Sequence, residues 1–195
     1  MYRKFYLTIL LLICFVSIRL LPAFSQSTVA EMFANISPLA ALALCGGMLL
    51  PMRIAMILTF GTFLLSDTIL NLKYGFSLIT PYSLFLLMFF AAIYFLGYSL
   101  RNKKTFSVLL VSTFFTSILF YFFANTFSFM FDSGYQKNFT GWLLANSKGL
   151  PGYPPAWIFG LKFILSNTLF ASAFYFALVP RNETIDVEIP QTQKI

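Results

Sequence analysis

The sequence predicts an all-α polytopic membrane protein, a bundle of six transmembrane helices. Hydrophobic residues make up 59% of the 195 residues and charged residues only 10%, against about 25% charged in a typical soluble domain. The mean hydropathy is +0.82. Six apolar runs are each about as long as a helix needs to cross the roughly 30 Å hydrocarbon layer. They cover residues 5–24, 36–51, 54–72, 82–100, 106–128 and 157–179.

The first run also has features of a cleavable signal. Met1–Lys4 is basic, and Phe5–Val16 is an apolar core of suitable length. However, Arg19 follows this core, and no small-x-small cleavage motif precedes Gln26. We therefore expect this segment to be retained as the first span.

The connections between the runs are consistent with six spans. Leu50–Arg53 leaves room only for a tight turn, and its proline ends the incoming helix. The longest connection, residues 129–156, is rich in Gly, Pro and aromatic residues, and within it Asn138–Asn146 predicts a short surface helix that could act as a lid. The polar tail, residues 181–195, is too short for a domain, so residues 1–180 are predicted to form one transmembrane domain.

Lys and Arg are distributed unevenly among the loops, which predicts the orientation. If the amino end is cytoplasmic, the inner loops and tails hold Arg3, Lys4, Arg53, Arg101, Lys103, Lys104, Arg181 and Lys194. The outer loops then hold only Lys73, Lys137 and Lys148. Because basic residues concentrate on the cytoplasmic side, we expect both termini in the cytoplasm. This asymmetry accounts for the net charge of +7, so binding of nucleic acid has no separate support.

Several chemistries lack the residues they need. The chain has no His, which removes the common zinc motifs and His-based catalytic triads, and it has no Walker loop or Gly-x-Ser-x-Gly motif. Cys14 and Cys45 both lie inside apolar runs and are interpreted as packing residues. We therefore expect no enzymatic activity, metal site or cofactor, and any nucleotide hydrolysis would come from a partner protein.

Polar residues from four spans gather at one depth. Asp67 follows Arg53 by 14 residues (67 − 53), or about 21 Å along a helix, which places it in the outer half of the bilayer. A charge in hydrocarbon costs roughly 3 kcal/mol or more. We therefore expect Asp67 to face the bundle interior, where it binds a charge partner or a ligand. The other residues at this level are Arg19, Asn71, Asn125 and Lys162.

Two interpretations of this cluster stay open. In the first, Asp67 pairs with Arg19 or Lys162, and three asparagines, Asn71, Asn125 and Asn167, bond across neighbouring helices, so that all of them only hold the bundle together. In the second, they face a ligand pocket that opens outward. The aromatic and polar residues of the outer connections favour the pocket, although an interfacial aromatic belt is also expected there. These residues are Tyr74, Thr80, Tyr82, Tyr135, Lys137, Trp142, Tyr153 and Trp157.

Small residues form a second pattern in the second run. Ala40, Ala43, Gly46 and Gly47 recur at three to four positions, which gives a smooth stripe where another helix can approach closely. Ala173 and Ala177 repeat this spacing in the last run. Such a stripe can serve packing between spans or contact with a partner protein.

Five short motifs carry a resemblance to a known family. They lie at Asn35–Gly47, Leu65–Asp67, Ala124–Asn125, Tyr135-x-Lys137-x-x-x-Gly141 and Ser166–Leu169. With them the chain, from about Arg19 to Leu178, resembles a family of uncharacterised bacterial integral membrane proteins. That family is similar to the substrate-binding S components of energy-coupling-factor (ECF) vitamin transporters, and most closely to the cobalamin-specific branch.

The resemblance implies a six-helix bundle that captures a vitamin-sized ligand and works with a transmembrane coupling protein and two ATPases. Helix-face alanines of such S components contact the coupling protein, a role that falls here on Ala40, Ala43 and Gly47. Asp67 and Tyr82 match the family's binding site. Members that ligate the corrin cobalt use a Cys in the loop after the third span, but the corresponding residues 73–82 contain no Cys or His. A corrinoid is thus one possible ligand among vitamin-like molecules.

We therefore expect a membrane subunit that captures a small molecule for uptake. Its expected binding residues are Asp67, Asn71, Tyr82, Asn125, Tyr135, Trp142 and Trp157, with Arg19 and Lys162 as charge partners. One alternative is a structural or assembly membrane protein with no ligand. Another is an intramembrane enzyme that uses Asp67 with Lys162, although one carboxylate and one amine specify no reaction.

Overall fold

The computed structural model describes residues 2–25, 27 and 36–179, and every regular element in this part of the chain is a helix. The predicted tail at residues 181–195 lies outside it. Met52–Met56, the π-helical turn Ile57–Gly61 and Thr62–Lys73 follow one another as one rod, called the 52–73 rod below. The elements in order are α1 (Tyr2–Phe24), α3 (Leu39–Leu49), α4 (Met52–Met56), η1 (Ile57–Gly61), α5 (Thr62–Lys73), α6 (Pro81–Ser99), α7 (Phe106–Phe131), α8 (Phe139–Ala145) and α9 (Ala156–Leu178).

Four helices are long and apolar enough to cross a membrane. They are the 52–73 rod, α6, α7 and α9. The apolar part of α1 that can be described, Leu12–Phe24, and α3 are shorter. The 11 residues of α3 rise about 16 Å, roughly half of a bilayer's hydrocarbon core. The all-helical class is confirmed, and four helices could span a membrane. The count of six spans is not confirmed, because the described apolar parts of the first two predicted spans, Leu12–Phe24 and Leu39–Leu49, are shorter.

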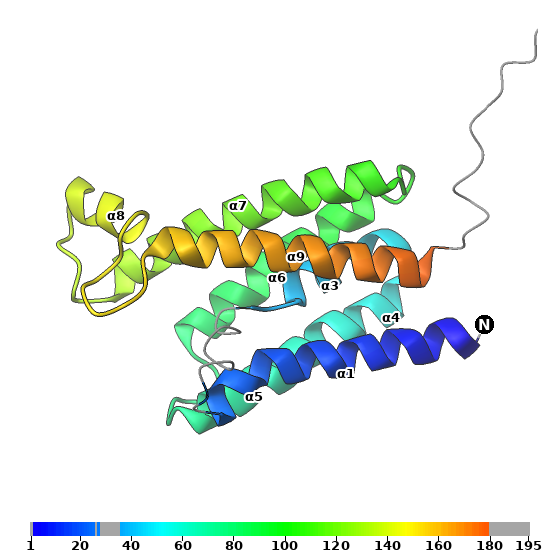
Figure 1. The fold of residues 1–195 in the computed structure, drawn as a ribbon, viewed down its shortest axis with the longest axis horizontal. Helices are drawn as coiled ribbons and strands as arrows, with labels where there is room; N and C mark the ends of the chain where they lie inside the picture. Colours follow the sequence, from blue (N-terminus) through cyan, green and yellow to red (C-terminus); the bar gives the residue numbers. More distant parts are fainter. Residues whose placement is uncertain (1, 26, 28–35, 180–195) are drawn as a thin grey trace, which may run out of the picture.

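The two ends of the bundle differ in the elements that they hold. In Figure 1 the amino end of α1 and the carboxyl end of α9 lie at the same end of the molecule, and α8 lies at the opposite end. We call these the terminal end and the α8 end. The turn at Leu50–Pro51 and the connection at residues 100–105 belong to the terminal end, while residues 74–80 and 132–155 belong to the α8 end.

The half-length helix α3 lies at the centre of the bundle and is capped at both ends by side chains from elsewhere in the chain. Its first residues have no side-chain cap of their own, but Asn167 of α9 accepts a hydrogen bond from the backbone N–H of Ala41 at 3.0 Å. At the other end, Arg101 donates to the carbonyl of Gly47 at 2.7 Å and to that of Leu50. A helix end buried in an apolar bundle needs such partners for its free N–H and C=O groups, so these two residues make a central half-helix possible.

The small residues of α3 serve packing inside the bundle. Leu39 to Met48 are all buried, and α3 contacts α6, α7, α9 and the 52–73 rod. A Cβ added to Gly47 would lie 2.2 Å from the Tyr94 carbonyl oxygen, and one added to Gly97 would lie 2.3 Å from the Leu44 carbonyl oxygen. The two helices therefore cross with their backbones in close contact. Ala40, Ala43 and Gly47, which the resemblance assigns to contact with a partner protein, are thus buried among neighbouring helices of the same chain.

The predicted short helix in the long connection is confirmed as α8. Asn138 caps it by accepting a hydrogen bond from the Gly141 N–H at 2.8 Å, as a helix N-cap does. Tyr121 of α7 donates to the Asn146 carbonyl at 2.6 Å, and Trp142 donates to Thr126 of α7 at 2.9 Å. The connection is therefore fastened to α7, and it covers the α8 end of the bundle.

Candidate functional site: cavities at the α8 end

A buried ion pair joins α1 to α5 near the α8 end. Arg19 Nη2 lies 3.3 Å from Asp67 Oδ1, and the two side chains are 11% and 12% exposed. Arg19 Nη1 also donates to the hydroxyl of Ser66. Of the two charge partners that the sequence allowed, the structure selects Arg19. Lys162 of α9 has no ion pair or hydrogen bond within the described residues.

The ion pair is extended to α6 by Asn71. Its Nδ2 lies 3.3 Å from Asp67 Oδ2, 3.2 Å from Ser83 Oγ and 3.1 Å from the Leu78 carbonyl oxygen. Ser83 is held in turn by a reciprocal capping arrangement with Thr80 at the start of α6. The polar side chains of α1, α5 and α6 thus form one connected chain, as the packing interpretation expects.

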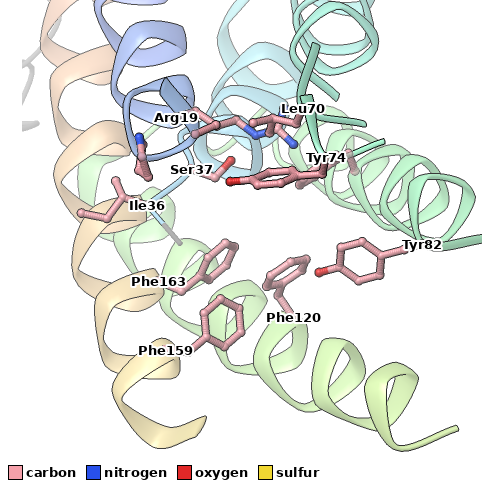
Figure 2. A pocket seen from close by; sticks show the side chains of 12 residues that line it. Arg19, Ile36, Ser37, Leu70, Tyr74, Tyr82, Phe120, Phe159 and Phe163 are labelled. Atoms are coloured by element: carbon pink, nitrogen blue, oxygen red, sulfur yellow. The ribbon is translucent and has the colours of Figure 1, made fainter. Parts of the chain in front are cut away.

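Beside the ion pair lies a cavity of about 280 Å³, called the inner cavity below. Ile36 and Ser37, which precede α3, line it, so it occupies the axial space just beyond the start of the half-length helix. Figure 2 shows Arg19, Tyr74 and Ser37 on one side, facing phenylalanine rings, with the Tyr82 hydroxyl pointing inward. The opposite wall is built from Phe120, Phe159 and Phe163.

A second cavity of about 340 Å³, called the outer cavity, lies next to the first and beneath the long connection. Tyr82 and Phe159 line both cavities, so their rings form the partition. Asn125 and Tyr135 line the outer cavity. The Asn125 amide donates to the carbonyl of Tyr121 in its own helix at 2.9 Å.

Tyr135 contributes a protonated phenol to the outer cavity. Burial and the nearby negative charge of Asp132 raise the pKa of this phenol above its usual value, although a hydrogen bond with the backbone of Leu150 opposes the shift. An unperturbed tyrosine already has a pKa of about 10. The hydroxyl therefore stays neutral at physiological pH and available as a hydrogen-bond donor.

Other predicted binding residues lie away from the two cavities. Asp67 contacts Arg19 but lines neither cavity, and Trp142 is hydrogen bonded to α7. Trp157 is 53% exposed on α9. Asn71 instead lines a third, mainly apolar cavity of about 450 Å³, where the connection at residues 74–80 meets α6 and α7 and which Tyr82 also lines. The structure therefore gathers Arg19, Tyr82, Asn125 and Tyr135 around the two cavities, and places the tryptophans elsewhere.

Sequence reasoning missed the phenylalanine wall of the inner cavity. Phe120 and Phe163 stack with ring centroids 4.2 Å apart, and Phe159 lies one turn before Phe163 on α9. Phe159 and Phe163 are spaced so that both lie on one helix face. This spacing is the sequence feature that could have indicated the wall. With 26 phenylalanines in the chain, this spacing alone did not single them out.

The described residues contain no group of three or more His, Cys, Asp or Glu side chains that could hold a metal ion. Cys14 is exposed, whereas Cys45 is buried in α3, and both are free thiols. The polar side chains around the cavities carry guanidinium, hydroxyl and amide groups, and Asp132 adds a carboxylate to the outer cavity. Such groups can bind a ligand by hydrogen bonds and charge.

The fold and its cavities define a class, an α-helical membrane protein with a partly polar, partly aromatic cavity at one end of its bundle. The chain belongs to the family of unknown function DUF6580, whose sequence profile matches residues 1–186. No curated protein and no solved structure matches the chain.

Proposed function

We propose that the protein is a substrate-capture subunit of the bacterial inner membrane, similar to the S components of ECF transporters. It takes a vitamin or a similar small molecule from the outer side for uptake. In this proposal the chain crosses the membrane six times, and α3 belongs to the second crossing. Both termini are cytoplasmic, and the α8 end faces outward.

The distribution of basic residues supports this orientation. The terminal end carries Arg53, Arg101, Lys103 and Lys104, whereas the α8 end carries Lys73, Lys137 and Lys148. Single-cysteine variants of a chain that lacks Cys14 and Cys45 test it. A membrane-impermeant maleimide should label Lys148→Cys in intact cells, and Lys103→Cys only after the cells are permeabilised. The reverse pattern contradicts the orientation.

The observation that carries the proposal is the pair of adjacent cavities at the α8 end. Ligand sites combine apolar and aromatic walls with a few polar groups, and the inner cavity has this composition, with Arg19 opposite Phe120 and Phe163. The cavities measure about 280 and 340 Å³, which favours a ligand much smaller than a corrinoid.

Uptake by this route needs an ECF coupling protein and ATPases, because the chain itself has no nucleotide-binding motif. The buried stripe on α3 does not offer them a surface, since Ala40, Ala43 and Gly47 are covered by other helices. Such partners would contact the exposed faces of the long helices instead.

A second candidate is a structural membrane protein that binds no ligand. The connected chain of Arg19, Asp67, Asn71 and Ser83 favours it, because these side chains bond to one another across three helices. In this case the cavities would be packing defects.

Mass spectrometry of molecules that co-purify with the protein in mild detergent separates the two candidates. Capture predicts one small molecule retained in near-equal amount with the protein. Asp67→Asn should weaken its retention, because Asp67 holds Arg19 beside the inner cavity, while the protein stays folded. Lys162→Gln is the matched control, since it removes a charge from a span without touching either cavity. Failure to recover any small molecule, together with loss of folded Asp67→Asn protein, supports the structural candidate.

A further inference from the structure

We propose that the inner cavity binds a small anionic molecule that carries an aromatic ring. Arg19 holds the anionic group, and Phe120 and Phe163 contact the ring. This inference rests on the proposed function and specifies the chemical class of its ligand.

The first argument concerns the hydrogen-bond donors of Arg19. A guanidinium has five N–H donors in a fixed fork, and within the described residues Arg19 makes two hydrogen bonds, to Ser66 and to Asp67. The contact with Asp67 is 3.3 Å, long for a charge-assisted bond, which typically measures about 2.7–2.9 Å. The ion pair therefore leaves most of the fork free to bind something else.

The second argument concerns where this fork lies. The Arg19 side chain is 11% exposed, and it lines the inner cavity. Buried donors are costly unless an acceptor meets them. A carboxylate or a phosphate offers two oxygens in the geometry that the fork fits, so an oxyanion in the cavity satisfies these donors better than a neutral group does.

The third argument concerns the sign of the charge that the cavity presents. Asp67 does not line the inner cavity, and the other polar side chains that do are the hydroxyl groups of Ser37, Tyr74 and Tyr82, all of which can donate to an anion. Ser37 also stands just before the first turn of α3, where the partial charge of a helix end is positive. Among the described residues, the lining thus presents a cation and donors and contains no carboxylate.

The fourth argument concerns the opposite wall. Phe120 and Phe163 stack at 4.2 Å with an interplanar angle of 17°, and Phe159 lies 6.0 Å from Phe163. In Figure 2 these rings face Arg19 across the cavity. Aromatic side chains pair favourably with a further ring in stacked or edge-on geometry. A volume of about 280 Å³ suits one or two fused rings with the anionic group pointing at Arg19.

Two probes that share a naphthalene ring, one with an anionic and one with a neutral polar substituent, test the inference. The full chain is placed in nanodiscs of phosphatidylcholine, and the dissociation constants of 1-naphthoate and of neutral 1-naphthalenemethanol are measured by equilibrium dialysis against empty nanodiscs. We expect naphthoate to bind about 10- to 100-fold more tightly, the usual effect of hydrogen bonds to a charged group. Equal binding of the two probes overturns the inference.

Substitutions at Arg19 and Asp67 test whether this ion pair is the source of the preference for the anionic probe. Arg19→Gln combined with Asp67→Asn removes both charges while leaving no buried carboxylate unpaired, and it should abolish the preference for naphthoate. Lys162→Gln should keep it. If the double variant does not fold, Arg19→Lys serves instead, because lysine keeps the charge but lacks the fork, and it should weaken naphthoate binding about tenfold. A preference for naphthoate that survives the double substitution, or naphthoate binding that is unchanged in Arg19→Lys, overturns the inference.

A lipid headgroup is the other source of an anion at this depth. Nanodiscs that contain phosphatidylglycerol distinguish a bound headgroup from a bound small molecule. If this lipid abolishes naphthoate binding and native mass spectrometry finds it retained by the wild type but not by the double variant, the anion is a headgroup and the small-molecule ligand is overturned. Unchanged naphthoate binding supports the inference. A neutral co-purifying ligand would overturn the inference that the ligand is an anion but would leave the proposed capture function standing. If no ligand co-purifies and neither probe binds, both the inference and the proposed function are contradicted.

Discussion

The terminal half and the α8 half of the bundle are built from the same long helices but are packed in opposite ways. In the terminal half, α3 fills the axis, and Gly47 and Gly97 bring α3 and α6 into backbone contact. In the α8 half the axis holds the inner cavity, which begins where α3 begins. A half-length central helix therefore closes one end of the bundle and leaves room for a ligand at the other.

The largest effect should come from breaking the ion pair of the α8 half. Arg19→Gln leaves the Asp67 carboxylate buried without its cation, which typically costs about 3–5 kcal/mol. We expect the free energy of unfolding, measured by denaturant titration in detergent, to fall by about this amount. Adding Asp67→Asn should recover most of the loss. Equal stability of the single and double variants would show that the pair contributes little to folding.

Filling the closest contact of the terminal half should have the next largest effect. In Gly47→Ala the new methyl group would lie 2.2 Å from the Tyr94 carbonyl oxygen, so α3 and α6 must separate. We expect a loss of about 3 kcal/mol, at the upper end of overpacking costs. Gly61→Ala is the matched control, because a Cβ there meets nothing within 4 Å. Similar thermal unfolding of the two variants would contradict the close approach.

Removing the Asn167 cap at the start of α3, where the two halves meet, should lower the free energy of unfolding by less. Asn167→Ala leaves the Ala41 N–H without its acceptor at the buried start of α3, a loss of roughly 1–3 kcal/mol. Because the cap also fixes the boundary of the inner cavity, ligand retention should fall with stability. Thr168→Ala, whose hydroxyl bonds only to its own helix at Ile164, controls for a polar truncation on α9. A stable Asn167→Ala variant would show that α3 does not need this cap.

The smallest effect on stability should come from a substitution in α8, the short helix over the α8 half. Trp142→Phe keeps an aromatic ring in α8 but loses the hydrogen bond to Thr126, worth about 1 kcal/mol. Since Trp142 lines neither cavity, its loss should leave the affinity for a ligand unchanged. Binding that falls as much as in Arg19→Gln would mean that the position of α8 controls the site.

The long helices were predictable because a bilayer sets their length. The expected runs 82–100, 106–128 and 157–179 match α6, α7 and α9 within a few residues, since each must be apolar over about 30 Å. The short helix α8 was predictable for a local reason, the Asn138 cap at its start. The predicted run 36–51 is helical only over Leu39–Leu49, because apolar composition does not reveal how much of a run is helical.

The site was only partly predictable for a different reason. Sequence placed Arg19, Asp67 and Lys162 at one depth, but the choice between the two cations depends on how the helices are rotated and tilted against one another. The same holds for the inner cavity, where Phe120 comes from α7 and Phe163 from α9. Such contacts join residues far apart in the chain, and periodicity along one helix carries no information about them.

The apolar runs and the positions of the charged residues were enough to predict helices that could span a membrane, with buried charges toward one end, because the cost of polar groups in hydrocarbon acts on each segment separately. Three further features could not be read from the sequence: the small residues of α3 face its own neighbours, Arg19 is the partner of Asp67, and a phenylalanine wall faces that arginine. Those outcomes depend on which helices pack side by side, and that is set by the whole bundle at once.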